Sequence, residues 1–84
     1  MHARVVVTLR AGVLDPAGQA VADGLEQLGF SEVRGVRIGK AIDIELAPGI
    51  ENARARLEEM SARLLANPVI EDFTIELLGE DEPG

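Results

Sequence analysis

Cysteine is absent from the 84-residue chain, so neither disulfide bonds nor thiolate metal sites are available to stabilise it. Tryptophan and tyrosine are absent too, and two phenylalanines are too few to form the aromatic platform on which nucleic-acid bases stack. The one histidine, His2, has no second histidine or cysteine to join it as a metal ligand. We therefore expect no transition-metal site and no nucleic-acid partner.

Positive charge is also scarce. Eight lysines and arginines stand against fifteen aspartates and glutamates, which gives a net charge of −7. Such a surface repels phosphate backbones and anionic lipids, so we expect neither nucleic acid nor membrane as a partner. The sequence shows no long apolar run and no secretory leader pattern, which favours a cytoplasmic protein.

The length of the chain fits a single domain, which we place at residues 1–79, followed by an acidic tail at 80–84. With 46% hydrophobic residues, the chain is too apolar to be disordered. A chain this short buries only about 60–65% of its unfolded surface on folding. A subunit interface is the natural source of further stability, so we expect a homo-oligomer.

Two segments near the start have clear periodicity. Residues 3–10 (ARVVVTLR) alternate, with Val5 and Val7 on one face, which predicts a half-buried strand. Asp15 followed by proline is a favourable start for a helix, and Gly29 is a favourable end. The apolar residues of this helix recur at helical spacing and predict a buried stripe, formed by Leu14, Ala17, Val21, Leu25 and Leu28.

Residues 32–46 (EVRGVRIGKAIDIEL) allow two arrangements, because nearly all of their apolar residues share one parity. A three-residue hairpin loop at 39–41 gives two strands and keeps these residues on one face. One long strand bent at Gly39 satisfies the pattern equally well. We favour the hairpin.

A second helix and a last strand complete the pattern. Residues 50–66 carry an apolar stripe that Leu65 widens, and the Asn67-Pro68 pair ends the helix. The stripe consists of Ile50, Ala53, Leu57, Met60 and Leu64. Residues 69–78 alternate, with Phe73 and Ile75 on the apolar face, which predicts a strand.

The resulting order is β-α-β-β-α-β, with one apolar face on each strand and one apolar stripe on each helix. This pattern predicts an α+β fold: a two-layer sandwich, ferredoxin-like in outline, with a mainly antiparallel sheet and both helices on one face. The opposite face of the sheet and its edges are then available to dock a second subunit.

The chain shows no constellation of residues that carries out chemistry. Gly35, Gly39 and Lys40 resemble part of a phosphate-binding loop, but the glycine spacing and the following hydroxyl residue are missing. Adjacent carboxylates such as Glu58 and Glu59 point in different directions on a helix, whereas acid–base catalysis needs carboxyl groups that converge in a cleft. We assign no catalytic, cofactor-binding or metal-binding residue to this chain.

Three cations lie near predicted strand ends and turns of this acidic chain: Arg10, Arg37 and Lys40. Two roles are open to them. They balance nearby acidic groups, or they contact a partner subunit, since loops often carry recognition.

Four fragments, taken in order, resemble the PurS family. They are VVVTLRAGVLDPAGQAV from Val5, LGF from Leu28, VRGVRIGK from Val33 and LLANPVIEDFTIEL from Leu64. Each fragment alone is a weak signal, but their succession over residues 3–78 is specific.

PurS is the small subunit of the phosphoribosylformylglycinamidine synthase of bacteria and archaea, a glutamine-dependent ligase of purine biosynthesis. The resemblance implies a non-catalytic chain that forms a dimer or tetramer. It also implies a bridge between the large synthetase subunit PurL, which uses Mg-ATP, and the glutaminase subunit PurQ, with assistance to ammonia transfer. Asp15, Arg37 and Lys40 lie in the matching motifs and, with Arg10, are our candidates for partner contacts.

A different class of function is a freestanding ferredoxin-like module that senses a small molecule. In that alternative, the loop at residues 10–14 binds an effector at a dimer edge. A small enzyme of the acylphosphatase kind is a third class, but the sequence lacks the loop pattern of that family.

Overall fold

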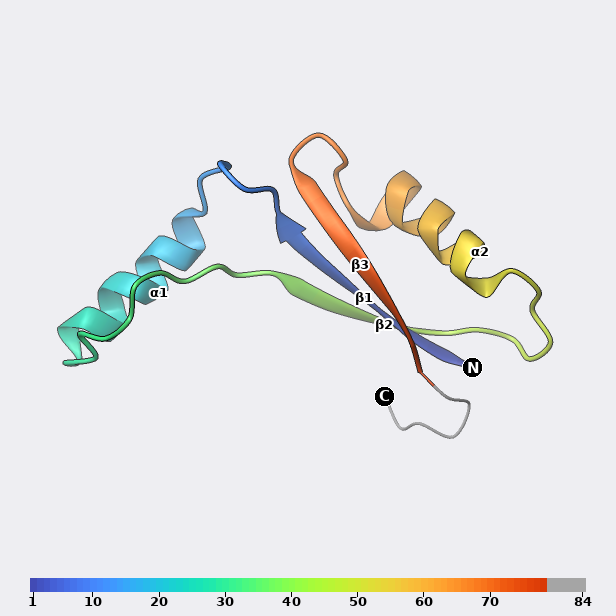
Figure 1. Ribbon diagram of the computed structural model, residues 1–84, viewed down its shortest axis with the longest axis horizontal. Helices are drawn as coiled ribbons and strands as arrows, with labels where there is room; N and C mark the ends of the chain where they lie inside the picture. The colour runs from blue at the N-terminus through green and yellow to red at the C-terminus, as the bar shows by residue number, and fades with distance from the viewer. Residues whose placement is uncertain (79–84) are drawn as a thin grey trace.

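The computed structural model describes residues 1–78 and contains a three-stranded sheet, two helices and a helical turn (Figure 1). In chain order these are β1 (His2–Leu9), α1 (Pro16–Gln27), β2 (Lys40–Glu45), α2 (Ala53–Met60), the π-helical turn η1 (Ser61–Leu65) and β3 (Glu71–Leu78). The expected acidic tail at 80–84 lies outside the described residues. Within these 78 residues no helix has the length and apolarity that crossing a bilayer requires.

The sheet has the order β2-β1-β3, and β1 runs antiparallel to both neighbours. Val5 lies opposite Ile42 on one side and Ile75 on the other, so apolar residues of all three strands share one face. Val5 and Val7 are almost completely buried, as the alternation in the sequence predicted. We call this apolar side the inner face of the sheet.

Helix α2 packs on the inner face beside β3 and closes the core. Leu57 is fully buried, and Ala53 one turn earlier is nearly so. The core joins Val5, Val7 and Ala66 to half-buried side chains from the other strands and from the end of the helix, namely Ile42, Ile44, Leu65, Phe73 and Ile75. Burial of these side chains between the sheet and the helical segment formed by α2 and η1 stabilises the single chain.

At both ends of the second helix, the buried residues differ from the predicted apolar stripe. It begins at Ala53, so Ile50 lies outside it and is exposed. At the other end the Ala66 N–H donates to the Ser61 carbonyl at 2.9 Å, a five-residue step that makes the last turn π-helical. The wider turn brings Leu65 towards the core and leaves Leu64 84% exposed, so the predicted burial of Leu64 is wrong.

The predicted hairpin within residues 32–46 is wrong. Residues 33–39 run extended along α1 and lead directly into β2, so only the second half of the stretch joins the sheet (Figure 1). Gly39 passes so close to β1 that an added Cβ would lie 2.6 Å from the Val7 carbonyl oxygen. The order is therefore β-α-β-α-β, and the α+β class with its antiparallel sheet and two helices is confirmed.

Helix α1 stands away from the sheet, at the end of the molecule opposite α2 (Figure 1). The chain measures 50 × 30 × 14 Å, and its radius of gyration of 16.2 Å exceeds the roughly 12 Å of a compact domain of this length. Most of the stripe that was predicted to be buried faces outward, with Leu14 76% and Leu28 75% exposed. We call residues 14–38, which contain α1 and the extended segment after it, the arm.

Candidate partner-binding surface

Asp15 joins the first turn of α1 to the extended segment before β2. One carboxylate oxygen accepts the Gly18 N–H at 2.8 Å, which is the N-cap bond that the Asp15-Pro16 sequence predicted. The other oxygen accepts the Ile38 N–H, also at 2.8 Å. The Ile38 bond, followed by the Gly18 bond, holds the pKa of Asp15 below its ordinary value, because both donors favour the carboxylate.

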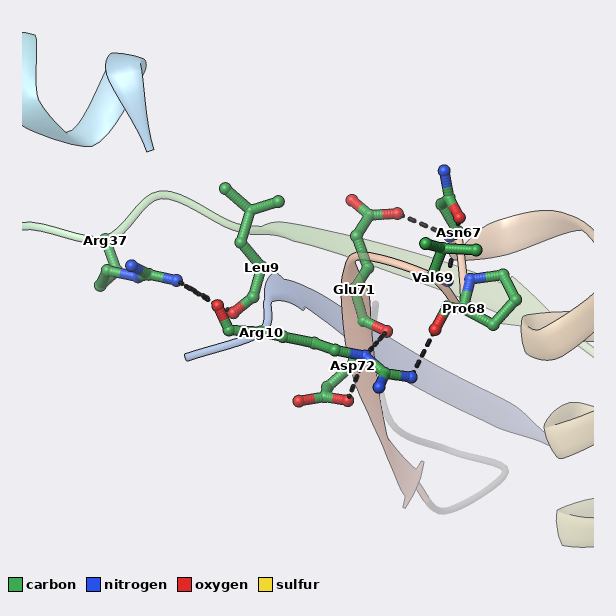
Figure 2. A network of polar contacts seen from close by, with 8 residues as sticks. All are labelled: Leu9, Arg10, Arg37, Asn67, Pro68, Val69, Glu71 and Asp72. Atoms are coloured by element: carbon green, nitrogen blue, oxygen red, sulfur yellow. Dashed lines mark hydrogen bonds and ion pairs between the residues drawn. The ribbon is translucent and has the colours of Figure 1, made fainter. Parts of the chain in front are cut away.

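Arg37 ties the same segment to the end of β1. Its guanidinium donates to the carbonyls of Leu9 and Arg10, each at 3.1 Å, and to the Val13 carbonyl at 3.3 Å. Figure 2 shows the Arg37 side chain reaching towards the carbonyls of Leu9 and Arg10. Together, Arg37 and Asp15 fix the angle at which the arm leaves the sheet.

Arg10 performs a similar task at the turn between α2 and β3. Its guanidinium donates to the Pro68 carbonyl and to the Glu71 carbonyl, and it lies 3.4 Å from an Asp72 carboxylate oxygen (Figure 2). Its backbone N–H donates to the Ile70 carbonyl at 2.8 Å. Arg10 therefore fastens this turn to the end of β1.

Lys40 differs from the other three candidates. It is the first residue of β2 and is exposed, and within residues 1–78 its ammonium group has no hydrogen bond or ion pair. It borders a shallow hollow of about 300 Å³ between the end of the sheet and the start of α1, with Leu9 and Ile38 as apolar walls. A partner contact through Lys40 stays a prediction. Of the four candidate residues, Lys40 is the one whose charge is available for such a contact.

These contacts weigh against an effector site at the loop of residues 10–14. Two of the carbonyls that such a site would offer, those of Arg10 and Val13, already accept hydrogen bonds from Arg37. The part of the chain that the structure describes also contains no group of three potential metal ligands. Recognition of a partner protein by this end of the molecule stays a prediction.

The outer face of the sheet, opposite α2, is mixed in character. Arg4 and Asp43 lie opposite each other on β1 and β2, and the two side chains pair at 2.7 Å. The bond from Arg4 lowers the pKa of Asp43 from its ordinary value. Val6 is half-buried on this face and Thr8 is exposed. Docking of a second subunit here stays a prediction.

The exposed apolar side chains of the arm are the feature that sequence reasoning missed. Leu14, Val21, Leu28, Phe30 and Ile38 are all exposed large hydrophobic residues. The helical spacing of Leu14, Val21 and Leu28 predicts burial, but in the single chain these side chains are exposed. Large apolar side chains that a single chain leaves exposed are often covered at a subunit interface.

Comparison with known proteins identifies the family. The family model for PurS, phosphoribosylformylglycinamidine (FGAM) synthase, matches residues 2–79. The chain is 52% identical over 77 residues to the FGAM synthase subunit PurS of Synechocystis sp., an alignment that covers 90% of this chain and 77% of that protein. It is 39% identical to the PurS subunit of Bacillus subtilis, with 88% of each chain covered.

Solved structures agree with the sequence comparison. The crystal structure of B. subtilis PurS has a TM-score of 0.81 at 39% identity and covers 89% of this chain and 94% of that one. The structure of PurLQS from Thermotoga maritima contains a chain with a TM-score of 0.74 at 28% identity, covering 92% of this chain and 96% of that one. The protein therefore belongs to the PurS family of FGAM synthase subunits.

Proposed function

We propose that this chain is the small, non-catalytic subunit of an FGAM synthase, in which it joins the synthetase PurL to the glutaminase PurQ. The observation that carries the proposal is the match along almost the whole chain to subunits of this name, together with a relative that occurs in a PurLQS structure. Mg-ATP and glutamine are used by the two larger subunits. This chain contributes the surfaces that bind the two larger subunits.

The arm gives the proposal its physical basis. An isolated chain leaves Leu14, Val21 and Leu28 in water, although burying each such side chain is worth about 1.5–3 kcal/mol. A second copy of the chain that covers the arm recovers this free energy and completes a compact body. Because Asp15 and Arg37 hold the arm out, an interface with another chain, rather than refolding of the arm onto its own sheet, is the outcome that we expect.

Such an oligomer increases the reaction rate by holding the two larger subunits in position. Ammonia released from glutamine is diluted and protonated in bulk water, so a synthetase that uses it benefits from a glutaminase held at a fixed distance. A rigid body that binds both subunits raises the effective concentration of the second reactant without making or breaking a bond. The proposal includes this assistance to ammonia transfer.

A reconstitution assay tests the function. FGAM formation by PurL and PurQ is measured with and without this chain, first with glutamine and then with a saturating ammonium salt as the nitrogen source. We expect that leaving the chain out sharply lowers glutamine-dependent turnover and has a much smaller effect on the ammonium-dependent reaction. Unchanged glutamine-dependent turnover in its absence would contradict the proposal.

A further inference from the structure

The π-helical turn η1, which continues α2, carries an apolar side chain whose exposure the fold does not explain. Leu64 is 84% exposed, more than any other large hydrophobic residue that the structure describes. The π-helical turn puts it there, because one extra residue in the turn rotates Leu65 inward and Leu64 outward. The exposure of Leu64 therefore follows from the hydrogen-bonded backbone of the turn. A π-helical turn is rare and often accompanies a functional site.

Charged groups surround this leucine in a defined pattern. Leu64 lines a shallow hollow together with Arg56, Glu59, Met60 and Arg63, and we call these five residues the α2 outer face. Glu59 lies between the two arginines, 3.2 Å from Arg63 and 3.8 Å from Arg56. One carboxylate cannot neutralise two guanidinium groups, so the face keeps a net positive charge on a chain of net charge −7.

The position of this face separates it from the arm. Figure 1 shows α1 and α2 at opposite ends of the long axis, with the sheet between them. A second copy seated on the arm need not cover the α2 outer face. This face is therefore available to a different protein within the same assembly.

We propose that the α2 outer face binds a segment of a larger synthase subunit in which a carboxylate stands beside an apolar side chain. The carboxylate complements the excess positive charge of Arg56 and Arg63, whose planar guanidinium groups bind carboxylates through paired hydrogen bonds. The apolar side chain covers Leu64 and Met60, and the flexible methionine adapts to its shape. This inference rests on the proposed function, since it needs PurL or PurQ as the partner.

Binding of variant chains to PurL and to PurQ, each immobilised separately, tests the inference. Leu64→Asp removes the apolar anchor and repels the partner's carboxylate, and we expect at least tenfold weaker binding to one of the two subunits. Val69→Asp is the matched control, because Val69 is 78% exposed but lies in the turn before β3, outside the α2 outer face. We expect that this control binds within twofold of the unaltered chain.

A charge variant provides an independent measurement. The double substitution Arg56→Glu and Arg63→Glu should weaken binding to the same subunit tenfold or more, whereas replacing both arginines by lysine should restore part of the affinity. The oligomeric mass of each variant, measured by light scattering, should equal that of the unaltered chain.

Three outcomes would contradict these expectations in distinguishable ways. Unaltered binding of Leu64→Asp, while the unaltered chain binds normally, overturns the inference and leaves the proposed function intact. Loss of the homo-oligomer in Leu64→Asp also overturns it, because the face would then belong to a second copy. Failure of the unaltered chain to bind either large subunit contradicts the proposed function itself.

Discussion

Gly18 and Gly24 lie in the same helix, but a methyl group added at each would meet very different surroundings. A Cβ at Gly18 would lie 2.5 Å from the Val36 carbonyl oxygen and 2.7 Å from a carboxylate oxygen of Asp15. A Cβ at Gly24 would have nothing within 4 Å. The two alanine substitutions therefore share their effect on helix propensity and differ only in what they contact.

The expected magnitudes follow from these contacts. Replacing glycine by alanine inside a helix gains about 0.5–1 kcal/mol, so Gly24→Ala should stabilise the chain by this amount. Gly18→Ala has the same gain but crowds the backbone of the arm, which costs about 1–3 kcal/mol. It also displaces the capping carboxylate of Asp15, at a cost of about 0.5–2 kcal/mol. Together these ranges give a net loss of roughly 0.5–4.5 kcal/mol.

Urea unfolding followed by circular dichroism measures both changes, at one fixed protein concentration because the stability of an oligomer depends on it. Gly24→Ala is the internal control for helix propensity. If Gly18→Ala were as stable as Gly24→Ala, the close approach of α1 to residues 36–38 would not exist in solution, and the argument for a rigid arm would be refuted.

Three further predictions follow from the core and from the ends of the sheet. Leu57→Ala should destabilise the chain by about 2–5 kcal/mol in the same urea assay, because Leu57 is fully buried, and a change within about 0.5 kcal/mol would contradict the packing of α2. Lys40→Glu should leave the unfolding midpoint unchanged but weaken co-purification with the large subunits, and full recovery of the complex would remove Lys40 from the interface. Since the pKa of Asp15 is lowered in the folded chain, its stabilisation is present above the ordinary aspartate pKa and is lost as the pH falls through the lowered value. Asp15→Asn should therefore reduce the loss of stability that the chain shows below about pH 4, as measured by urea unfolding over that range. Asp43, whose pKa is also lowered, supplies the acid dependence that remains. An unchanged pH profile would contradict the role of the Asp15 carboxylate in holding α1 to residue 38.

Local patterns predicted those parts of the fold that depend on neighbours in the sequence. The alternation around Val5 and Val7 identified β1 and its buried face. Asp15 followed by proline marked the start of α1 and its capping bond. In each case the stabilising interaction lies within a few residues, so the sequence alone contains the signal.

The sequence-based predictions were wrong where the structure depends on contacts between distant residues, or on which of two identical neighbouring side chains is buried. Residues 33–39 do not form a hairpin because Ile38 and Arg37 bond to groups 23–28 residues earlier, and spacing cannot reveal these contacts. Leu64 and Leu65 are chemically identical neighbours, so helical periodicity could not tell which one a π-helical turn would bury.

The predicted surface residues met a related difficulty. Arg10 and Arg37 are candidates because of their charge near turns, and Asp15 because it lies in a motif that resembles the family. The structure engages the polar groups of all three within the chain. A sequence pattern shows that a charge stands near a loop but not whether a carbonyl lies within its reach. Conversely, helical spacing predicted a buried stripe on α1, but most of that stripe is exposed in the single chain because α1 stands away from the sheet.

The mass of a mixture of PurL and PurQ, measured by light scattering after size exclusion with and without this chain, tests most directly whether it acts as the joining subunit. We predict that one species containing all three proteins forms only when the chain is present, and that the two large subunits elute separately in its absence. A stable complex of PurL with PurQ that forms equally well without the chain would contradict this account.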